Sequence, residues 1–337
     1  MVTAPQSNWG VSTEAARVHR QAIVWDMHGC MPLRPDADLG EIARYARAGA
    51  SFISLNVGFD LVPWSEAVKI AAHFRAWVLA HPERYLLADT AADVRRAKRE
   101  GKLAVAFDLE GARALDGQIS MIAAFYRLGV RSMLLAYNAN NEFSAGCTGA
   151  DTGLTPLGRQ AIAEMNRVGM IVDCSHMGCR STMEVLEISA APVVFSHSNP
   201  SALNRHHRNI GDGQIRACAA TGGVIGINGV GRFLGDPETR SETIARHVDY
   251  VAQLVGAAHV GLGLDCVFDL DELDAFHKNH PGSFPEGSAW TRDQARFAQP
   301  EQLPEITENL LRLGYSEEDI GGVLGGNFLR VAEQVWT

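Results

Sequence analysis

Eight short runs of apolar residues recur along the chain, rich in the β-branched and aromatic side chains that favour strands. Several runs are apolar at consecutive positions, as in VVF, VIGI and AVAF, which is typical of strands covered on both faces. We expect strands at Ala22–Asp26, Ser51–Asn56, Leu103–Asp108, Ser132–Ala136, Met170–Asp173, Pro192–Ser196, Gly223–Asn228 and His259–Leu264.

Segments with helical spacing lie between these runs. We expect helices at Trp64–Ala80, Ala91–Arg99, Ile119–Leu128, Pro156–Val168, Thr182–Ile188, Gly213–Ala220 and Glu242–Leu254. Strands that alternate with helices predict βαβ units and a parallel sheet. Eight such units in 337 residues favour an α/β fold of the closed (β/α)8 type, the TIM barrel, over an open sheet.

The two ends of the chain and one internal segment fall outside this alternation. Additional C-terminal helices are expected at Leu303–Leu313, at Ser316–Leu324 and from Gly325 onward. Residues 1–20 are expected to form an N-terminal extension. Residues 266–302, rich in Asp, His, Pro and Gly, are expected to form a long loop near the active face. No repeat or linker is visible, so residues 1–337 are expected to form a single domain.

Composition narrows the classes of partner. The formal net charge of −9 disfavours nucleic acid and anionic membrane surfaces, which leaves a small molecule as the expected partner. The first twenty residues show no apolar segment behind a basic start, and no stretch approaches the roughly 18 apolar residues of a membrane span. The six cysteines are scattered, without a CxxC pair. We therefore expect a cytoplasmic protein without a disulfide framework.

Polar residues follow five of the expected strands at their downstream ends. They are His28, Glu110, His176, His197 and Asp265. A parallel barrel brings the carboxyl ends of all its strands to one face, so these residues are expected to converge. Three imidazoles and two carboxylates are typical of a metal-dependent hydrolase.

The first metal position rests on His28, Cys30 and Glu110. His28 and Cys30 are two residues apart, so an extended backbone points both the same way, and both are zinc ligands. Glu110 could bridge two metals with its two oxygens. The alternatives are a capping histidine, a cysteine packed as a small hydrophobe and a carboxylate that caps the next helix.

A second metal position rests on the Ser-His pairs that end two successive strands, which place His176 and His197 side by side. Arg208 lies in a basic cluster that could clamp a substrate carboxylate, or could be a solvated loop. Asp265 follows the Gly-rich last strand and could move a proton near a metal, or could cap a helix.

In this order and spacing, several motifs together resemble the membrane (renal) dipeptidase family, zinc peptidases of the amidohydrolase superfamily. The resemblance runs from about Ile23 to the end of the chain and rests on Leu109–Gly111, Leu154–Met177, Ala191–Asn199, Arg208-Asn209, His259–Asp265 and Gly325–Val331. It implies a (β/α)8 barrel, a possible homodimer, and hydrolysis of small dipeptides by a metal-bound hydroxide.

The resemblance also implies roles for individual residues. His28 matches a first-strand metal ligand, Glu110 the catalytic carboxylate that bridges both zincs, and His176 and His197 the ligands of the second zinc. Arg208, with Asn209 beside it, matches the site for the substrate's C-terminal carboxylate. Asp265 matches the catalytic carboxylate that carries a proton from the attacking water to the leaving amine.

Two positions depart from the family pattern. Cys30 stands where the family has Asp, and Tyr137 stands where it has a substrate-binding His. Cys30 could bind zinc as a thiolate and complete a binuclear site, or the site could hold one ion. Tyr137 can donate one hydrogen bond to a carbonyl oxyanion but carries no positive charge near neutral pH.

These departures keep two other functions open. One is a related amidohydrolase that acts on another small amide, a cyclic amide or an N-acyl compound. The other is a catalytically silent binding protein on the same fold, because a fold does not determine a function.

Overall fold

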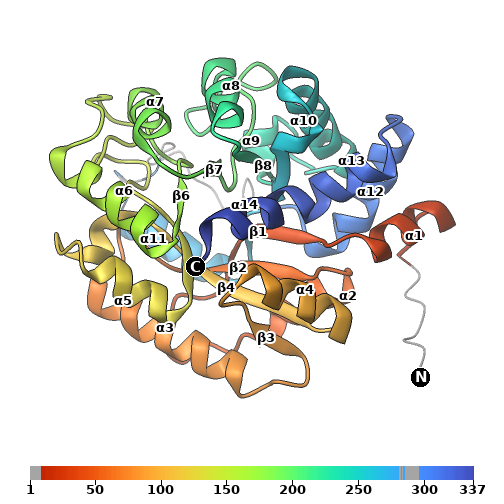
Figure 1. Ribbon diagram of the computed structural model, residues 1–337, viewed down its shortest axis with the longest axis horizontal. Helices are drawn as coiled ribbons and strands as arrows, with labels where there is room; N and C mark the ends of the chain where they lie inside the picture. Colours follow the sequence, from red (N-terminus) through yellow and green to blue (C-terminus); the bar gives the residue numbers. More distant parts are fainter. Residues whose placement is uncertain (1–8, 281, 283, 285–295) are drawn as a thin grey trace.

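The computed structural model describes residues 9–280, 282, 284 and 296–337. Its parallel strands follow one another around a barrel (Figure 1). They are β1 (Trp25–Cys30), β2 (Phe52–Phe59), β4 (Leu103–Glu110), β5 (Val130–Leu134), β6 (Ile171–Asp173), β7 (Val193–Phe195), β8 (Val224–Asn228) and β9 (Val260–Gly263). Just beyond β9, β10 (Cys266–Val267) pairs with β1, whereas β9 pairs with β8. The last strand therefore closes the circle, and the expected (β/α)8 fold is confirmed.

Two short strands were not expected from the sequence, namely β10, which lies in the segment expected as a loop, and β3. β3 (Tyr85–Leu87) pairs with the first residues of β4, while the later residues of β4 pair with β5 along the same edge. Three residues are too few to show a periodicity, so the apolar pattern gives no sign of this strand. The expected first strand also ended too early, because β1 continues to Cys30.

Helices surround the strands (Figure 1). They are α1 (Thr13–Gln21), α2 (Ala43–Arg47), α3 (Trp64–Leu79), α4 (Ala91–Glu100), α5 (Met121–Leu128), α6 (Pro156–Val168), α7 (Cys179–Ile188), α8 (Asp212–Ala220), α9 (Gly231–Leu234), α10 (Ser241–Val255), α11 (Leu270–Asn279), α12 (Leu303–Arg312), α13 (Glu317–Gly321) and α14 (Asn327–Val335). Short 3-10 turns are η1 (Gly40–Ile42), η2 (Ala112–Leu115), η3 (Ala257–His259) and η7 (Pro300–Gln302), and η8 (Gly322–Gly326) is a π-helical turn. Within the described ranges, no helix has the length and apolar character needed to cross a bilayer.

Local signals explain where the helices begin and end. The hydroxyl of Thr155 accepts a hydrogen bond from the Gly158 amide, and Pro156 occupies the first turn of α6. Gly169 ends that helix in the left-handed conformation, with φ of +84°. Four helices lie where no helix was expected from the sequence: α1, in the N-terminal extension, the short α2 and α9, and α11. The segment 266–302 that was expected as a loop holds β10 and α11, and its residues 281, 283 and 285–295 lie outside the described residues.

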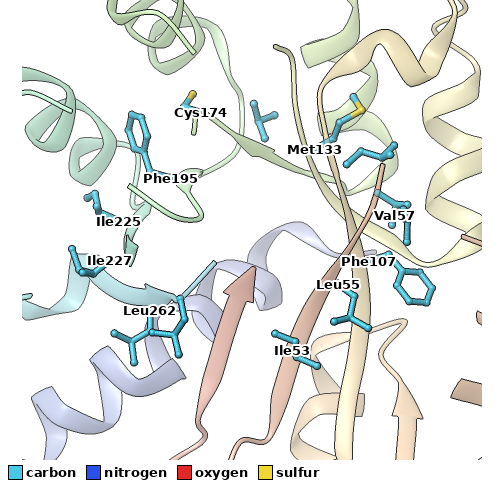
Figure 2. Packing of buried hydrophobic residues seen from close by; sticks show 14 of the residues in the cluster. Ile53, Leu55, Val57, Phe107, Met133, Cys174, Phe195, Ile225, Ile227 and Leu262 are labelled. Carbon is cyan, nitrogen blue, oxygen red and sulfur yellow. The ribbon is translucent and has the colours of Figure 1, made fainter. Parts of the chain in front are cut away.

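The core has two parts. The larger part lies between the strands and the surrounding helices, and Figure 2 shows Ile53, Leu55 and Val57 following one another along β2 in this layer. The smaller part fills the barrel at the amino ends of the strands, where the rings of Trp25 and Phe52 stack with centroids 3.7 Å apart.

The C-terminal helix closes this apolar end of the barrel. Phe328 of α14 lies 6.4 Å from Trp25 between ring centroids. Gly261 of β9 makes room for it, because a Cβ at this position would lie 2.3 Å from Phe328 Cε2. Figure 1 shows α14 crossing close to β1. The amino ends of the strands are therefore sealed by packed rings.

Two β-bulges lie near the opposite end. Between Asp26 and Gly29, β1 has one residue more than β2, and between Asn56 and Phe59, β2 has one residue more than β4. A bulge breaks the strict alternation of faces and redirects the side chains that follow it. In β1 this brings His28, three positions after the inward-facing Trp25, into the interior of the barrel.

Candidate metal centre

Four polar side chains meet at the carboxyl ends of the strands. Glu110 Oε1, at the end of β4, lies 3.0 Å from His176 Nε2, 3.3 Å from His197 Nε2 and 3.6 Å from His28 Nε2. All four side chains are buried. The four residues are separated by up to 169 positions, and the barrel alone brings them together.

The two imidazoles of His176 and His197 face each other in their neutral form. Their Nε2 atoms are 2.9 Å apart, and His176 Nδ1 lies 2.7 Å from Asn138 Oδ1. Because the amide oxygen only accepts, Nδ1 of His176 carries the proton and Nε2 carries a lone pair. Burial lowers the pKa of both imidazoles well below the ordinary value, and the charges of Arg208 and His28 lower it further.

A hydrogen-bond chain sets the same tautomer in His197. The hydroxyl of Ser196 donates to Asp173 Oδ2 and lies 2.6 Å from His197 Nδ1. With its proton committed to the carboxylate, the hydroxyl accepts from Nδ1–H, and Nε2 again carries a lone pair. Two lone pairs and a carboxylate oxygen therefore point at one spot. Such an arrangement is favourable only with a proton or a cation between these atoms, so the donor set fits a metal ion.

His28 is oriented by a carboxylate. Its Nδ1 lies 3.1 Å from Asp108 Oδ1, and Asp108 in turn accepts from Ser54 Oγ at 2.6 Å and from Asn56 Nδ2 at 3.3 Å. This arrangement directs Nε2 of His28 toward Glu110. Burial by itself would lower the pKa of His28, but the charges of Asp108 and Glu110 outweigh burial and hold it well above its ordinary value.

Glu110 is the carboxylate at the centre of the site. Burial raises its pKa to about 8, and the negative charges of Asp265 and Asp108 add to the effect while His28 opposes it. Its Oε2 accepts from Asn56 Nδ2 at 3.1 Å, and its Oε1 faces the imidazoles. Without a cation the ionised carboxylate is unfavourable here.

Cys30 and Asp265 lie on the other side of His28. Cys30 Sγ is 3.5 Å from His28 Nε2 and 3.7 Å from Asp265 Oδ1, and burial raises the pKa of the thiol to about 12. Asn228 holds Asp265 by donating to its Oδ2 at 2.9 Å. Asp265 lies in the interruption between β9 and β10, where the barrel closes.

Donor atoms gather in two overlapping groups. His28, Glu110 and His197 form one group, and His28, Cys30 and Asp265 form the other, each with all its ligand atoms within 4.8 Å of one another. Imidazole, thiolate and carboxylate are all zinc ligands. The two groups share His28. Together they offer five donor residues.

Backbone strain accompanies the site. Asn138, His176 and Asp265 adopt left-handed conformations with φ of 55°, 65° and 58°. Residues with a Cβ rarely occupy this region, and each instance costs on the order of 1 kcal/mol or more. The surrounding structure holds these three side chains toward the centre in spite of that cost.

A pocket of about 840 Å³, open to solvent, lies above the candidate metal ligands. Arg208 lines it, and its Nη2 donates to the carbonyl of His197 at 3.1 Å. Among the described residues its buried Nε has no hydrogen-bond partner. Tyr137 also lines the pocket, with its ring stacked on His176 at 4.3 Å, and burial raises the pKa of its phenol well above the ordinary value.

One of the expected substrate-binding residues lies outside this pocket. The amide of Asn209 donates to the carbonyls of Asn204 and Phe233, both at 2.8 Å, and the residue does not line the pocket. Its position next to Arg208 in the sequence suggested a contact with the substrate. The side chain of Asn209 instead points away from the pocket, toward the backbone at Asn204 and Phe233.

Several residues that orient the candidate ligands were not expected from the sequence. Asn56, Asp173 and Asn228 are the polar last residues of expected strands, so the rule of polar strand ends could have found them. Asn138 gave no such signal, because it becomes a neighbour of His176 only when the barrel forms.

Comparison with known proteins places the chain among peptidases. The family model described as membrane dipeptidase (peptidase family M19) matches residues 65–270, more than half of the chain. The match spans Glu110, His176, His197 and Asp265 but begins after His28. An amidohydrolase from Pseudomonas aeruginosa has a similar structure, with a TM-score of 0.85, 27% identity, and coverage of 96% of this chain and 99% of that one.

Two curated relatives are dipeptidases by description. An uncharacterised dipeptidase from Schizosaccharomyces pombe is 34% identical over 242 residues, which are 69% of this chain and 53% of that protein. Dipeptidase tcpJ from Claviceps purpurea is 33% identical over 260 residues, which are 76% of this chain and 56% of that protein. The chain thus spans about half the length of these two relatives. On the family match and these identities, the chain belongs to the membrane dipeptidase family, peptidase family M19.

Proposed function

We propose that the protein is a zinc-dependent hydrolase that cleaves the amide bond of small dipeptides. The observation that carries the proposal is the convergence of two neutral imidazoles on one buried carboxylate, with an arginine in the same pocket. The descriptions of the two curated relatives as dipeptidases add support.

The ligands divide into two sets that share Glu110. Glu110, His176 and His197 would hold one zinc ion, and His28 and Cys30 together with Glu110 would hold the other. When bound, the metal would activate a water molecule and polarise the scissile carbonyl.

The remaining pocket residues act on the substrate directly. Arg208 would bind the C-terminal carboxylate of the substrate. Its buried Nε has no hydrogen-bond partner among the described residues, and its positive charge would pair with the negative carboxylate. Tyr137 stays protonated and would donate a hydrogen bond to the carbonyl oxygen. Asp265, held by Asn228, would accept a proton from water and pass it to the leaving amine.

Cys30 contributes to the choice of metal. A thiolate is a softer ligand than a carboxylate and favours zinc over hard cations. In the metal-free protein the thiol pKa is raised to about 12, but a coordinating metal removes the thiol proton outright. Cys30 would therefore act as a thiolate ligand, beside His28, only when zinc is bound.

The test combines metal analysis with activity. Purified protein loaded with zinc should contain two zinc ions per chain and hydrolyse members of a dipeptide library. Glu110→Gln should lose both properties, whereas Glu142→Gln, a matched change on the surface, should keep them. Inactivity of the zinc-loaded protein across the whole library would reject the proposal. A chain that retains no metal would instead favour a silent binding protein.

The role of Cys30 has its own readout. Protein loaded with cobalt should show a sulfur-to-cobalt charge-transfer band in the near ultraviolet. Cys30→Ser should abolish that band, and Cys179→Ser, on the exposed start of α7, should leave it unchanged. A band that survives Cys30→Ser would exclude the thiolate as a ligand.

A second candidate is an amidohydrolase for another small amide, a cyclic amide or an N-acyl compound. It is favoured by Cys30 and Tyr137 because both depart from the family pattern and both line the substrate pocket. If it is correct, Cys30→Asp combined with Tyr137→His should raise dipeptidase activity. An unchanged or lower rate in the double variant would argue against it.

A further inference from the structure

One side of the pocket is formed by four aromatic side chains, Phe59, Tyr137, Phe276 and Phe284, here called the aromatic wall. The centroid of Phe59 lies 5.0 Å from that of Tyr137 and 4.8 Å from that of Phe276, and Tyr137 lies 6.1 Å from Phe284. Tilted and edge-to-face pairs at these separations attract each other beyond their area of contact. The wall is therefore a packed unit beside the metal ligand His176, on which Tyr137 stacks.

The chain builds this wall from distant elements. Phe59 ends β2 just after the bulge in that strand, and Phe276 comes from α11. Helix α11 is anchored to the segment that follows β1, because Glu272 accepts a hydrogen bond from the Leu33 amide at 2.8 Å and Asp269 pairs with Arg34 at 3.2 Å. The acidic groups of α11 that line the pocket are thus engaged with the chain itself.

The aromatic wall lies across the barrel from Arg208. Around the closed sheet, three strands separate β2 from β7 in either direction when β9 and β10 count as one strand. Phe59 ends β2, and Arg208 is tied to the end of β7 through the carbonyl of His197. The metal ligands lie between these two sides.

This placement defines how a substrate would lie, provided that the proposed amide hydrolysis is correct. A substrate whose carboxylate binds Arg208 and whose carbonyl lies at the metal ligands directs its acyl part toward the aromatic wall. We propose that the substrates are amides of an amino acid whose acyl part carries a large apolar group, an aromatic group above all.

The physical reason is burial of apolar surface. An aromatic side chain against Phe59 and Phe276 leaves water and gains ring contacts, whereas a charged acyl side chain would lose hydration there. Apolar pockets discriminate between a large and a small side chain by roughly 10- to 200-fold in kcat/KM. We expect a preference of this size for the acyl side. We expect a smaller one for the leaving side, where the ring of Phe233 lies against Arg208 with its centroid 5.5 Å from the guanidinium carbon.

The experiment measures the cleavage of four dipeptides by zinc-loaded protein. Phe-Ala should exceed Gly-Ala in kcat/KM by about 10- to 100-fold, and Ala-Phe should show no comparable gain over Ala-Ala. Phe276→Ala should reduce the Phe-Ala to Gly-Ala ratio toward one. Lys278→Ala, on the solvent-facing side of the same helix, is the matched control and should keep the wild-type ratio. A wild-type ratio at or below one overturns the proposal.

A fifth substrate tells whether the protein cleaves dipeptides or N-acyl amino acids. 3-Phenylpropanoyl-Ala is Phe-Ala without its amine. Comparable cleavage of both identifies N-acyl amino acids as substrates, and cleavage of Phe-Ala alone identifies dipeptides. Either result supports an aromatic acyl group, whereas a preference for Lys-Ala or Glu-Ala over Phe-Ala contradicts it.

Binding separates failure of this inference from failure of the proposed function. Calorimetry with zinc-loaded Asp265→Asn measures affinity without turnover. Binding of Phe-Ala at least tenfold tighter than Gly-Ala supports the aromatic wall even if no amide is cleaved by the wild type, in which case only the hydrolase function fails. Equal affinities refute the wall as a specificity element even if dipeptides are cleaved.

Discussion

The same strands build both ends of the barrel, but one end is filled by apolar rings and the other by polar side chains. At the amino ends, Trp25, Phe52 and Phe328 pack as buried rings. At the carboxyl ends, Glu110 and three histidines face one another with their donor atoms closer together than uncompensated charges and lone pairs favour. The packed rings at the closed end stabilise the fold. The buried polar side chains at the open end lower the stability of the metal-free fold, and together they form a candidate cation site.

The comparison teaches that burial has opposite effects at the two ends. Burial of a ring removes apolar surface from water and contributes directly to stability. Burial of a carboxylate raises the pKa of Glu110 to about 8 and disfavours its ionised form. Changes at the closed end should therefore alter stability, and changes at the open end should alter metal binding and activity.

The largest effect is expected from Glu110→Gln. The variant removes the carboxylate that contacts both imidazoles, so activity should fall by about 1,000-fold or more, and bound zinc should decrease. Steady-state kinetics and metal analysis measure the result. The free energy of unfolding of the metal-free variant should equal or exceed that of the wild type, and a marked loss of stability would contradict the comparison.

Phe328→Ala should produce the converse result. Removal of a fully buried ring from the closed end should lower the free energy of unfolding by about 3–5 kcal/mol, as measured with urea. The folded fraction should keep its zinc content and its kcat. Leu313→Ala, at an exposed position, serves as the control and should change stability by less than about 0.5 kcal/mol.

The stability of the metal-free protein should fall as the pH rises from about 6.5 to 8. The folded-state pKa of Glu110, about 8, lies above its ordinary value of 4.5, so the folded chain keeps a proton that the unfolded chain releases. The raised pKa of His28 acts in the same direction. The lowered folded-state pKa values of His176 and His197 act in the opposite direction, mainly near pH 6.5, where the unfolded chain still binds protons at these residues. Glu110 alone accounts for a change on the order of 2 kcal/mol.

Urea titrations of the metal-free protein at several pH values measure this slope. Glu110→Gln should flatten it, because the glutamine does not titrate. Zinc should reverse it, since metal binding requires deprotonated ligands and strengthens as the pH rises. If the free energy of unfolding of the metal-free protein rose over the same pH range, burial of Glu110 would not be the cause of instability at the open end.

The smallest effect is expected from Ser196→Ala. This change removes the hydroxyl that accepts from His197 Nδ1 and links it to Asp173, so the tautomer of the imidazole is no longer held. Zinc affinity should fall by about tenfold, as measured by competition with a chelator. Ser189→Ala, whose hydroxyl bonds outside the site, should leave the affinity unchanged.

Much of the fold could be predicted because the strands are buried on both faces and therefore appear as continuous apolar runs. The polar residues that end these runs, such as His176 and His197, were also visible. β3 and α11 were not, since three residues show no period and α11 is held by contacts with Leu33 and Arg34 from the other end of the chain.

By itself, the sequence determined the alternation of strands and helices and the identity of the metal-ligand candidates, because both depend on local pattern and residue type. Only the tertiary structure decided which atoms face one another. The bulge in β1 turns His28 inward, Ser196 sets the tautomer of His197, and closure of the barrel brings the aromatic wall opposite Arg208. These relations depend on distances between residues far apart in the chain, and no local pattern encodes such distances.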